Sequence, residues 1–227
     1  MGGTVFKQYL EECKIPLKKI QVVGNPYFDE LFEERNQTLA ENKGFVLLAA
    51  QSPKVSISVI DVEIKTMEKY LETVKTICKT VLKAEKELII KLHPDPYELD
   101  ITSFVKKIDP KIRVIKTGNI SDLIKTCDVL VTNDVSTVIL EGQIFEKPVI
   151  SVSARNYSIG DDNCSFFKSK SCVRTELQNF EMDFNRLLQD PEFKREMIKK
   201  GKKFVNDYLS NQGSASRKLI EFSIKQP

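Results

Sequence analysis

Apolar residues follow two patterns along this chain: short continuous runs, and stripes that recur every three or four positions. The runs are rich in Val, Ile and Leu and are followed within three residues by Gly, Pro, Asn or Ser, which is typical of strands buried on both faces. The strands predicted in this way cover residues 20–23, 45–50, 88–92, 112–115, 129–132 and 149–152.

The stripes at helical spacing lie between these runs. The clearest stripe puts five apolar side chains on one helix face, namely Ile64, Met67, Leu71, Val74 and Cys78. The predicted helices cover residues 4–13, 27–42, 64–82, 98–107, 121–127 and 136–146, with three more at 176–189, 191–209 and 214–224.

Strands that alternate with helices predict a parallel sheet covered on both faces. Right-handed crossovers then make it an α/β, Rossmann-like, doubly wound sheet of about six strands. A polar loop at 154–171 separates this sheet from a helical tail at 176–227. We find neither an internal repeat nor a low-complexity linker, so residues 1–227 are expected to form one domain.

The composition is that of a soluble globular protein, with 41% apolar and 30% charged residues. The 35 basic residues are dispersed among 32 acidic ones, so no basic face predicts nucleic-acid binding. Five cysteines without a CxxC pair, and a single histidine, indicate neither a disulfide framework nor a metal site. We expect a cytoplasmic protein, peripheral to a membrane only through weak attraction of Lys199, Lys200, Lys202 and Lys203 to anionic lipid.

Ligands of doubly wound sheets bind beyond the carboxyl ends of the strands. Here those ends are followed by polar or glycine-containing turns, which should converge on one rim: Gly24-Asn25, Gln51-Ser52, His93-Pro94, Thr117-Gly118-Asn119 and Asp134 to Thr137. The Gly-Asn-Pro turn at 24–26 does not match GxGxxG, so we expect no NAD-type cofactor, and nothing else in the sequence predicts a cofactor.

The turn before the helix at 136–146 is the strongest candidate for an anion site. The N-terminus of a helix offers unpaired N–H groups to a phosphate, although Asp134, Ser136 or Thr137 could instead act as an ordinary N-cap. Glu141, one turn later, faces either solvent or the cleft. His93 either bonds to local backbone or donates to a phosphate or sugar.

Several segments resemble, in this order, the C-terminal, nucleotide-sugar-binding half of GT-B fold proteins. IQVVGNPYFDEL at 20–31 resembles the opening of that half, KLHPDP at 91–96 its His-Pro motif, and TNDVSTVILEGQIFEKPVISV at 132–152 its phosphate and ribose segment. Residues 211–224 are similar to its final helix. The particular groups are the UDP-N-acetylglucosamine 2-epimerases, the CDP-glycerol glycerophosphotransferases and the capsule-type glycosyltransferases of polysaccharide biosynthesis.

The resemblance implies a UDP- or CDP-linked sugar donor and a role for each residue of the rim. His93 would contact the diphosphate and stabilise the leaving group. The turn from Asp134, with Ser136 and Thr137, would hold phosphate oxygens, and Glu141 would bond the ribose hydroxyls.

The same resemblance places the remaining rim residues at the two ends of the ligand. Thr117, Gly118 and Asn119 would lie beside the base, whereas Gln51 and Ser52 would line the mouth. It implies no metal, and we assign no catalytic base in this chain.

Two departures from the family pattern bear on function. The 2-epimerases usually have Ser-Gly-Gly where this chain has Val135-Ser136-Thr137, which favours a transferase over the alternative of an epimerase. The family also has an N-terminal acceptor domain that this sequence lacks, so we expect the chain alone to be an incomplete enzyme. That domain, or a partner subunit, would supply the rest of the active site. In one enzyme split in this way, the partner subunit is bound to a membrane. A third alternative is a non-catalytic interaction module that uses the tail from 176 to 224.

Overall fold

The computed structural model of the protein describes residues 10–16, 18, 20–37, 43–53, 60–154 and 165–224. Six strands form a sheet in the order β3-β2-β1-β4-β5-β6. Every neighbouring pair is parallel, so the predicted α/β, Rossmann-like fold class is confirmed. The strands are β1 Val46–Ala50, β2 Leu88–Leu92, β3 Arg113–Ile115, β4 Val129–Asn133, β5 Val149–Val152 and β6 Val173–Thr175.

The number of strands agrees with the prediction, but their identities differ at both ends of the chain. Residues 20–23 are not a strand, because this segment pairs with no strand and instead lies against the C-terminal segment, where Asn211 Nδ2 donates to the carbonyl of Val22 at 3.4 Å. The sixth strand is β6, which the sequence did not reveal. It lies at an edge of the sheet, and its three residues include Arg174, a charge of the kind that edge strands often carry.

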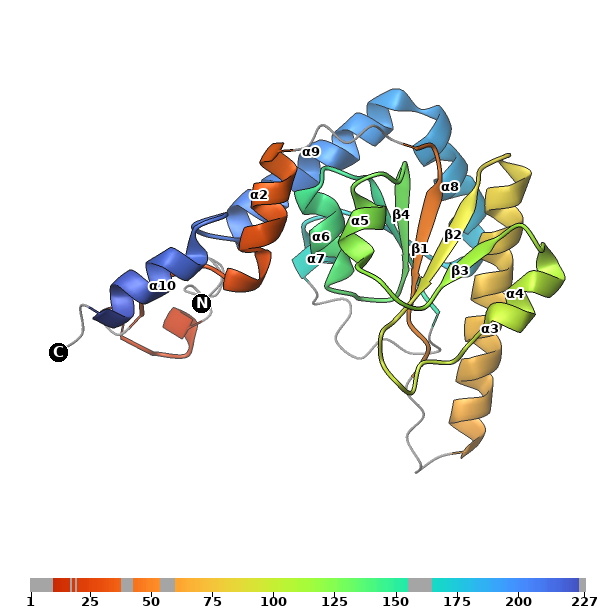
Figure 1. Ribbon diagram of the computed structural model, residues 1–227, viewed down its shortest axis with the longest axis horizontal. Coiled ribbons are helices and arrows are strands. Elements are labelled where there is room, and N and C mark those ends of the chain that lie inside the picture. The colour runs from red at the N-terminus through yellow and green to blue at the C-terminus, as the bar shows by residue number, and fades with distance from the viewer. Residues whose placement is uncertain are drawn as a thin grey trace.

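Helices cover both faces of the sheet. α3 (Ile60–Lys83), α4 (Thr102–Ile108) and α8 (Phe180–Gln189) pack on one face, against alternate residues such as Val46 and Leu48. α5 (Ile120–Ile124), α6 (Val138–Ile144) and α7 (Ser165–Lys168) cover the other face, where Leu47 is buried. In Figure 1, α3 and α4 lie at the right of the sheet and α6 at the left.

Three more helices lie at the left of Figure 1, beyond α6. They are α2 (Asp29–Gln37), preceded by the 3-10 turn η2 (Pro26–Phe28), α9 (Pro191–Tyr208) and α10 (Ala215–Ile224). Another 3-10 turn, η4 (Leu177–Asn179), leads into α8. The predicted tail helices are therefore confirmed, although the first of them starts later than residue 176.

Several predicted boundaries shift. The helix expected over 98–107 begins at Thr102, and the one expected over 136–146 spans only Val138–Ile144. The helix expected over 4–13 is seen at residues 10–12 and gives way to a turn at residue 13, whereas residues 4–9, like most of the loop at 154–171, lie outside the described residues. Within the described part of the chain, no helix is long and apolar enough to cross a membrane.

The order in which the chain adds strands to the sheet reverses between β1 and β4. These strands are neighbours, yet the chain leaves β1 toward the face of α3 and leaves β4 toward the face of α6. The side chain of Asn133 ties the two ends together, because its Oδ1 accepts from the N–H of Gln51 at 2.8 Å and its Nδ2 donates to the carbonyl of Gln51 at 2.5 Å. A crevice at such a reversal is the usual ligand site of this fold.

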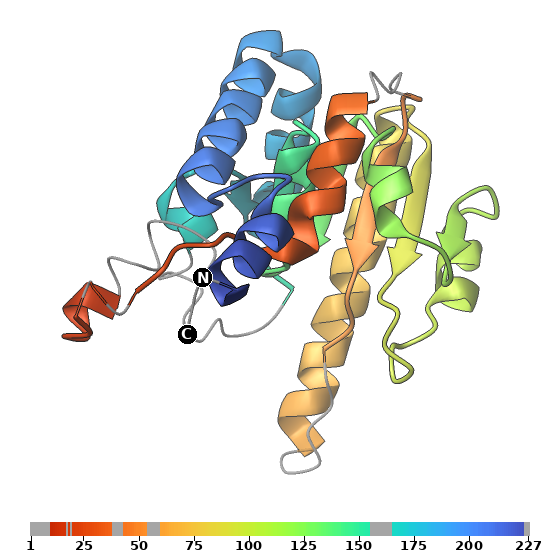
Figure 2. The same ribbon diagram turned by 60° about the vertical axis from the view of Figure 1, so that its left-hand side comes forward.

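The Gly-Asn-Pro-x-x-Asp segment fastens the C-terminal helix to the domain. Gly24 has φ of +93°, and a Cβ there would lie 2.3 Å from the carbonyl oxygen of Ser210, so only glycine fits. The carboxylate of Asp29 accepts from the N–H groups of Ala215 at 2.9 Å and Ser216 at 2.7 Å, and so caps the start of α10. Figure 2 shows α10 (dark blue) lying against the start of α2 (red-orange).

We predict that Asp29→Ala lowers the free energy of unfolding at pH 7 by about 1 kcal/mol, the usual cost of losing an N-cap. Burial acts to raise the pKa of Asp29, but the hydrogen bonds from Ser216 and Ala215 outweigh it and the pKa lies below its ordinary value. The stabilisation is therefore present above the unfolded pKa of about 3.9 and is lost as pH falls through the lower folded value.

Urea unfolding of the unaltered protein and of Asp29→Ala, at pH 7 and at acid pH, measures this difference in the free energy of unfolding. Glu30→Ala is the matched control, because Glu30 also lies in the first turn of α2 but is exposed and caps nothing. An equal loss of stability in Asp29→Ala and Glu30→Ala would contradict the capping role.

Candidate functional site

A cavity of about 280 Å³ opens at the carboxyl edge of the sheet, beside the reversal between β1 and β4. It lies on the face covered by α5 and α6. The residues that line it come from η2, from the ends of β1 and β2, from the loops that follow β1 to β4, and from α5 and α6: Tyr27, Ala49, Ala50, Gln51, Lys91, Leu92, His93, Pro94, Gly118, Asn119, Ile120, Ser136, Thr137, Val138 and Glu141.

Most of the rim residues predicted from the sequence line this one cavity. They are Gln51, His93, Gly118, Asn119, Ser136, Thr137 and Glu141. Gly24 and Asn25, which were expected at the same rim, are not among the lining residues, and Tyr27 takes their place. The structure thus brings together side chains that are up to 114 positions apart in the sequence.

Three predicted site residues lie outside the cavity. Ser52 is buried, donating its N–H to Glu98 Oε1 at 2.7 Å and accepting from the N–H of Leu99 at 3.3 Å, so it holds the loops rather than lining the mouth. Asp134 is also buried, and its Oδ1 accepts from the N–H of Ala154 at 3.0 Å. Thr117 is exposed beyond the end of β3.

The residues of the turn between β4 and α6 have different roles. Asp134 adopts a left-handed conformation, with φ of +58°, which turns the chain away from the strand. Ser136 Oγ accepts from the N–H of Val138 at 3.3 Å, so Ser136 supplies the cap, whereas the Thr137 side chain makes no capping bond. Within the described residues the N–H groups of Ser136 and Thr137 reach no acceptor. They remain available to an anion.

Glu141 faces the cleft and not the solvent. Its side chain is 3% exposed, Oε1 lies 3.4 Å from the hydroxyl of Tyr27, and Oε2 lies 3.3 Å from Oγ of Ser121. Burial raises the pKa of Glu141, and the hydrogen bonds from Ser121 and Tyr27 offset part of that rise. A carboxylate held by two long hydroxyl contacts keeps acceptor capacity for the hydroxyls of a ligand.

His93 bonds to local backbone and points into the cavity at the same time. Its N–H continues the ladder by donating to the carbonyl of Ala50 at 3.1 Å. Its Nδ1 accepts from the N–H of Asp95 at 3.1 Å, so the neutral imidazole carries its proton on Nε2. His93 can therefore donate a hydrogen bond from Nε2 into the cavity. The bond to local backbone uses Nδ1, so the two roles considered for His93 do not exclude each other.

Three residues of the site were missed in the sequence. Tyr27 and Ser121 flank Glu141, and only their positions in the fold reveal this. Lys91 lines the cavity from within β2. Its signal was present in the sequence, because a lysine in the otherwise apolar run LIIKL is out of place in a strand buried on both faces.

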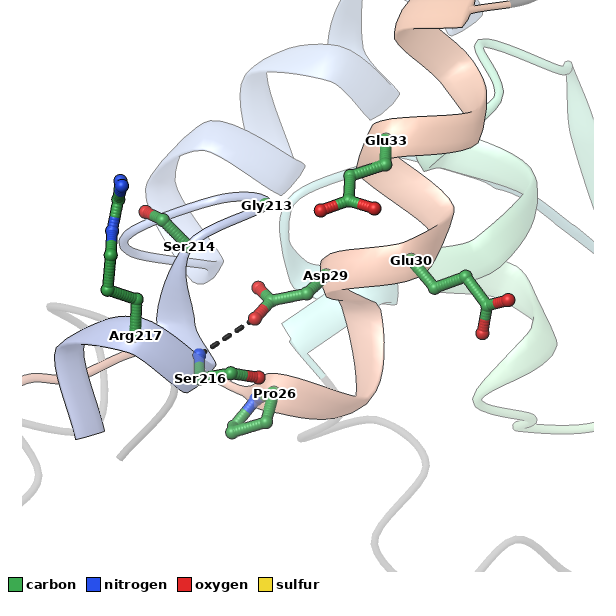
Figure 3. Close-up of a pocket in the computed structure, with 8 residues that line it drawn as sticks. All are labelled: Pro26, Asp29, Glu30, Glu33, Gly213, Ser214, Ser216 and Arg217. Atoms are coloured by element: carbon green, nitrogen blue, oxygen red, sulfur yellow. Dashed lines mark hydrogen bonds between the residues drawn. The ribbon is translucent and has the colours of Figure 1, made fainter. Parts of the chain in front are cut away.

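A second, wider hollow of about 630 Å³ lies between α2 and the start of α10, and Figure 3 shows its lining. Its carboxylates are Asp29, Glu30 and Glu33, and Asp29 is committed to capping α10. It contains no rim residue predicted from the sequence. No group of three or more His, Cys, Asp or Glu side chains suited to a metal ion occurs in the described parts of the chain.

The fold is similar to that of solved UDP-N-acetylglucosamine 2-epimerases and of a solved glycosyltransferase. The chain is similar to the UDP-GlcNAc 2-epimerase from Neisseria meningitidis solved with UDP-GlcNAc bound, with 17% identity, a TM-score of 0.63, and 99% of this chain and 60% of that chain covered. A second UDP-N-acetylglucosamine 2-epimerase gives 18% identity and a TM-score of 0.59, covering 98% and 56%.

A glycosyltransferase from Rickettsia africae has the same fold, with 15% identity, a TM-score of 0.52, and 99% of this chain and 63% of that chain covered. The chain thus spans roughly three fifths of the length of these solved structures. Identities this low show the fold alone. No family model and no curated protein matches the sequence.

We predict that Glu141→Gln raises the free energy of unfolding at pH 7, because it removes a buried charge. The folded state holds the proton of Glu141 more tightly than the unfolded chain does. The stability of the native protein therefore falls as pH rises from the unfolded pKa of about 4.3 through the higher folded value.

The gain in the free energy of unfolding of Glu141→Gln should be complete above the folded pKa of Glu141 and should vanish below the unfolded pKa. Urea unfolding at a series of pH values measures it. Glu85→Gln, at an exposed position, is the matched control and should change stability little at any pH. A loss of stability in Glu141→Gln at pH 7 would mean that the carboxylate stabilises the fold.

Proposed function

We propose that this chain is the nucleotide-sugar-binding domain of a glycosyltransferase or a related polysaccharide- or teichoic-acid-type transferase. The observation that supports this most is the meeting of His93, the Ser136–Thr137 turn and the buried Glu141 in one cavity at the reversal of the sheet. These groups offer hydrogen-bond donors for phosphate oxygens and an acceptor for sugar hydroxyls.

The proposed ligand lies across the carboxyl ends of the strands. Its diphosphate accepts from the N–H groups of Ser136 and Thr137 above β4 and from Nε2 of His93 above β2. Its ribose hydroxyls donate to Glu141, and its base lies beside Gly118 and Asn119 beyond β3. Donors fixed in this way stabilise the negative charge that develops on the departing diphosphate during transfer.

A cavity of about 280 Å³ is at the small end for a nucleotide sugar, since ligand sites usually measure about 300–1,000 Å³. It accommodates the nucleotide better than the whole donor. We infer that the sugar projects toward an acceptor-binding domain in the same polypeptide or in a partner subunit. The coverage of roughly three fifths of each similar structure supports this division.

A UDP-N-acetylglucosamine 2-epimerase is the alternative enzyme class, because two of the similar structures are such epimerases. The turn Val135-Ser136-Thr137 favours a transferase over the Ser-Gly-Gly pattern of the epimerases. Of these turn residues, none has a positive φ, so the conformation requires no glycine there.

A partner-binding role is supported by the apolar surface of α10. Leu219, Ile220, Phe222 and Ile224 are exposed, Ile220 by 59% and Ile224 by 78%, on a helix that projects from the end of the domain (Figure 1). Exposed apolar side chains that gather on one helix mark a contact surface. In the proposed enzyme this helix contacts the acceptor-binding half, whereas in a non-catalytic interaction module it would be the whole function.

Electrostatic attraction to a membrane gains little support. Three of the four lysines considered for it are neutralised by carboxylates: Lys200 by Glu196 at 2.6 Å, Lys202 by Glu146 at 2.8 Å and Lys203 by Asp207 at 2.5 Å.

We predict that the folded chain binds UDP or CDP with micromolar to millimolar affinity in calorimetry. His93→Asn should weaken binding about tenfold, the effect of losing one hydrogen bond to a charged group. His93→Gln should weaken it less, because the Gln amide can place an N–H near the position of Nε2.

Thr117→Ala is the control for this series, because Thr117 lies outside the cavity and its loss should leave the affinity unchanged. If the folded protein binds none of UDP, CDP, GDP and ADP, the proposed function is wrong. Binding to a partner that depends on α10 but tolerates His93→Asn would instead favour the interaction module.

We also predict that the 227-residue chain alone releases nucleotide from UDP- or CDP-linked sugars far more slowly than an ordinary enzyme turns over. The cavity supplies leaving-group stabilisation, but no acceptor is held beside the anomeric carbon, so the rate gain from positioning two reactants is missing. Turnover of the order of one per second or faster would contradict this and place a complete active site in the chain.

A further inference from the structure

Lys91 is a buried cation in the wall of the cavity. It belongs to β2, its side chain is only 4% exposed, and its four strand neighbours are Leu or Ile. Its ammonium group donates to the carbonyls of Leu92 at 3.0 Å and Lys116 at 3.1 Å. Among the described residues it forms no ion pair with a carboxylate.

This arrangement lowers stability compared with an apolar residue at the same place. Burial lowers the pKa of Lys91, because the charged form loses its hydration and gains only two neutral acceptors. An ammonium group has three N–H donors, and two of them are used here. The third is left for an acceptor inside the cavity.

The hydrogen bonds of Lys91 show which side of the cavity its ammonium group occupies. Nζ donates to the carbonyl of Lys116, which directly follows β3 and lies two residues before Gly118. The ammonium group is therefore held on the β3 side of β2, near Gly118 and Asn119, where the base of the proposed ligand lies.

We infer that Lys91 donates its third N–H to a carbonyl oxygen of the nucleobase and so selects keto-bearing bases against adenine, an inference that rests on the proposed function. Uracil, like thymine, presents O4, and guanine presents O6, whereas adenine has an amino group at the corresponding position. An ammonium group attracts the carbonyl oxygen and repels the amino hydrogens. Cytosine has an amino group where uracil has O4, so at this contact it resembles adenine.

Calorimetry with UDP, CDP, GDP, ADP and pyrophosphate tests this role. Lys91→Met keeps the length of the side chain without its charge, and we expect it to weaken UDP binding about tenfold or more. ADP and pyrophosphate should be affected little, so the preference for UDP over ADP falls. Lys116→Met removes an exposed charge from the adjacent strand end without altering the cavity lining, and it should behave like the unaltered protein.

Each outcome has a distinct meaning. Failure of the unaltered protein to bind any nucleotide overturns the proposed function itself. Nucleotide binding with an unchanged preference in Lys91→Met overturns the base-selecting role alone. Equal weakening of UDP, ADP and pyrophosphate also overturns it, because it places the ammonium group against phosphate.

If Lys91→Met does not fold, Lys91→Gln replaces it. The amide of Gln retains an uncharged donor beside the strand-end carbonyls, and it should keep part of the preference for UDP over ADP while lowering the affinity for UDP. A preference in Lys91→Gln identical to that of the unaltered protein, with equal affinity, would show that the charge of Lys91 has no part in recognising the base.

Discussion

The pairing of β1 with β4 is the constraint on which the rest of the site depends. Because the chain leaves these neighbouring strands toward opposite faces, a crevice opens beyond their carboxyl ends. The Asn133 side chain then holds the crevice at a defined width by bonding both main-chain polar groups of Gln51. These two hydrogen bonds continue the pairing of β1 with β4 at the point where the two backbones diverge.

The wall of the cavity contains buried ionisable groups, whereas the core around it is apolar. Glu141 and Lys91 are almost fully buried, and burial opposes ionisation of both, raising the pKa of Glu141 and lowering that of Lys91. Each is held by neutral groups, two hydroxyls for Glu141 and two carbonyls for Lys91. Such groups stabilise the fold less than apolar side chains would, and they offer a ligand hydrogen bonds in a site of low dielectric constant.

The segment from Gly24 to Asp29 connects the cavity to the C-terminal helix α10. Tyr27 contacts Glu141, while Asp29, two residues later, caps α10 by accepting from Ser216, 187 positions away. Gly24 permits the close approach to Ser210 that the arrangement needs. One short segment thus contacts both the cavity, through Tyr27, and the start of α10, through Asp29.

The sequence by itself determined the alternation of strands and helices, the parallel sheet and most of the rim, because these follow from local apolar patterns and from the rule that strand ends carry the ligand. Of the rim residues that it named, His93, Ser136, Thr137 and Glu141 line the cavity. Tertiary structure alone decided that residues 20–23 stay outside the sheet while β6 enters it, since pairing depends on which edge is free. It also turned Ser52 and Asp134 inward and brought Tyr27 and Ser121 to Glu141, because a side chain's direction and distant neighbours are set by packing that no local pattern encodes.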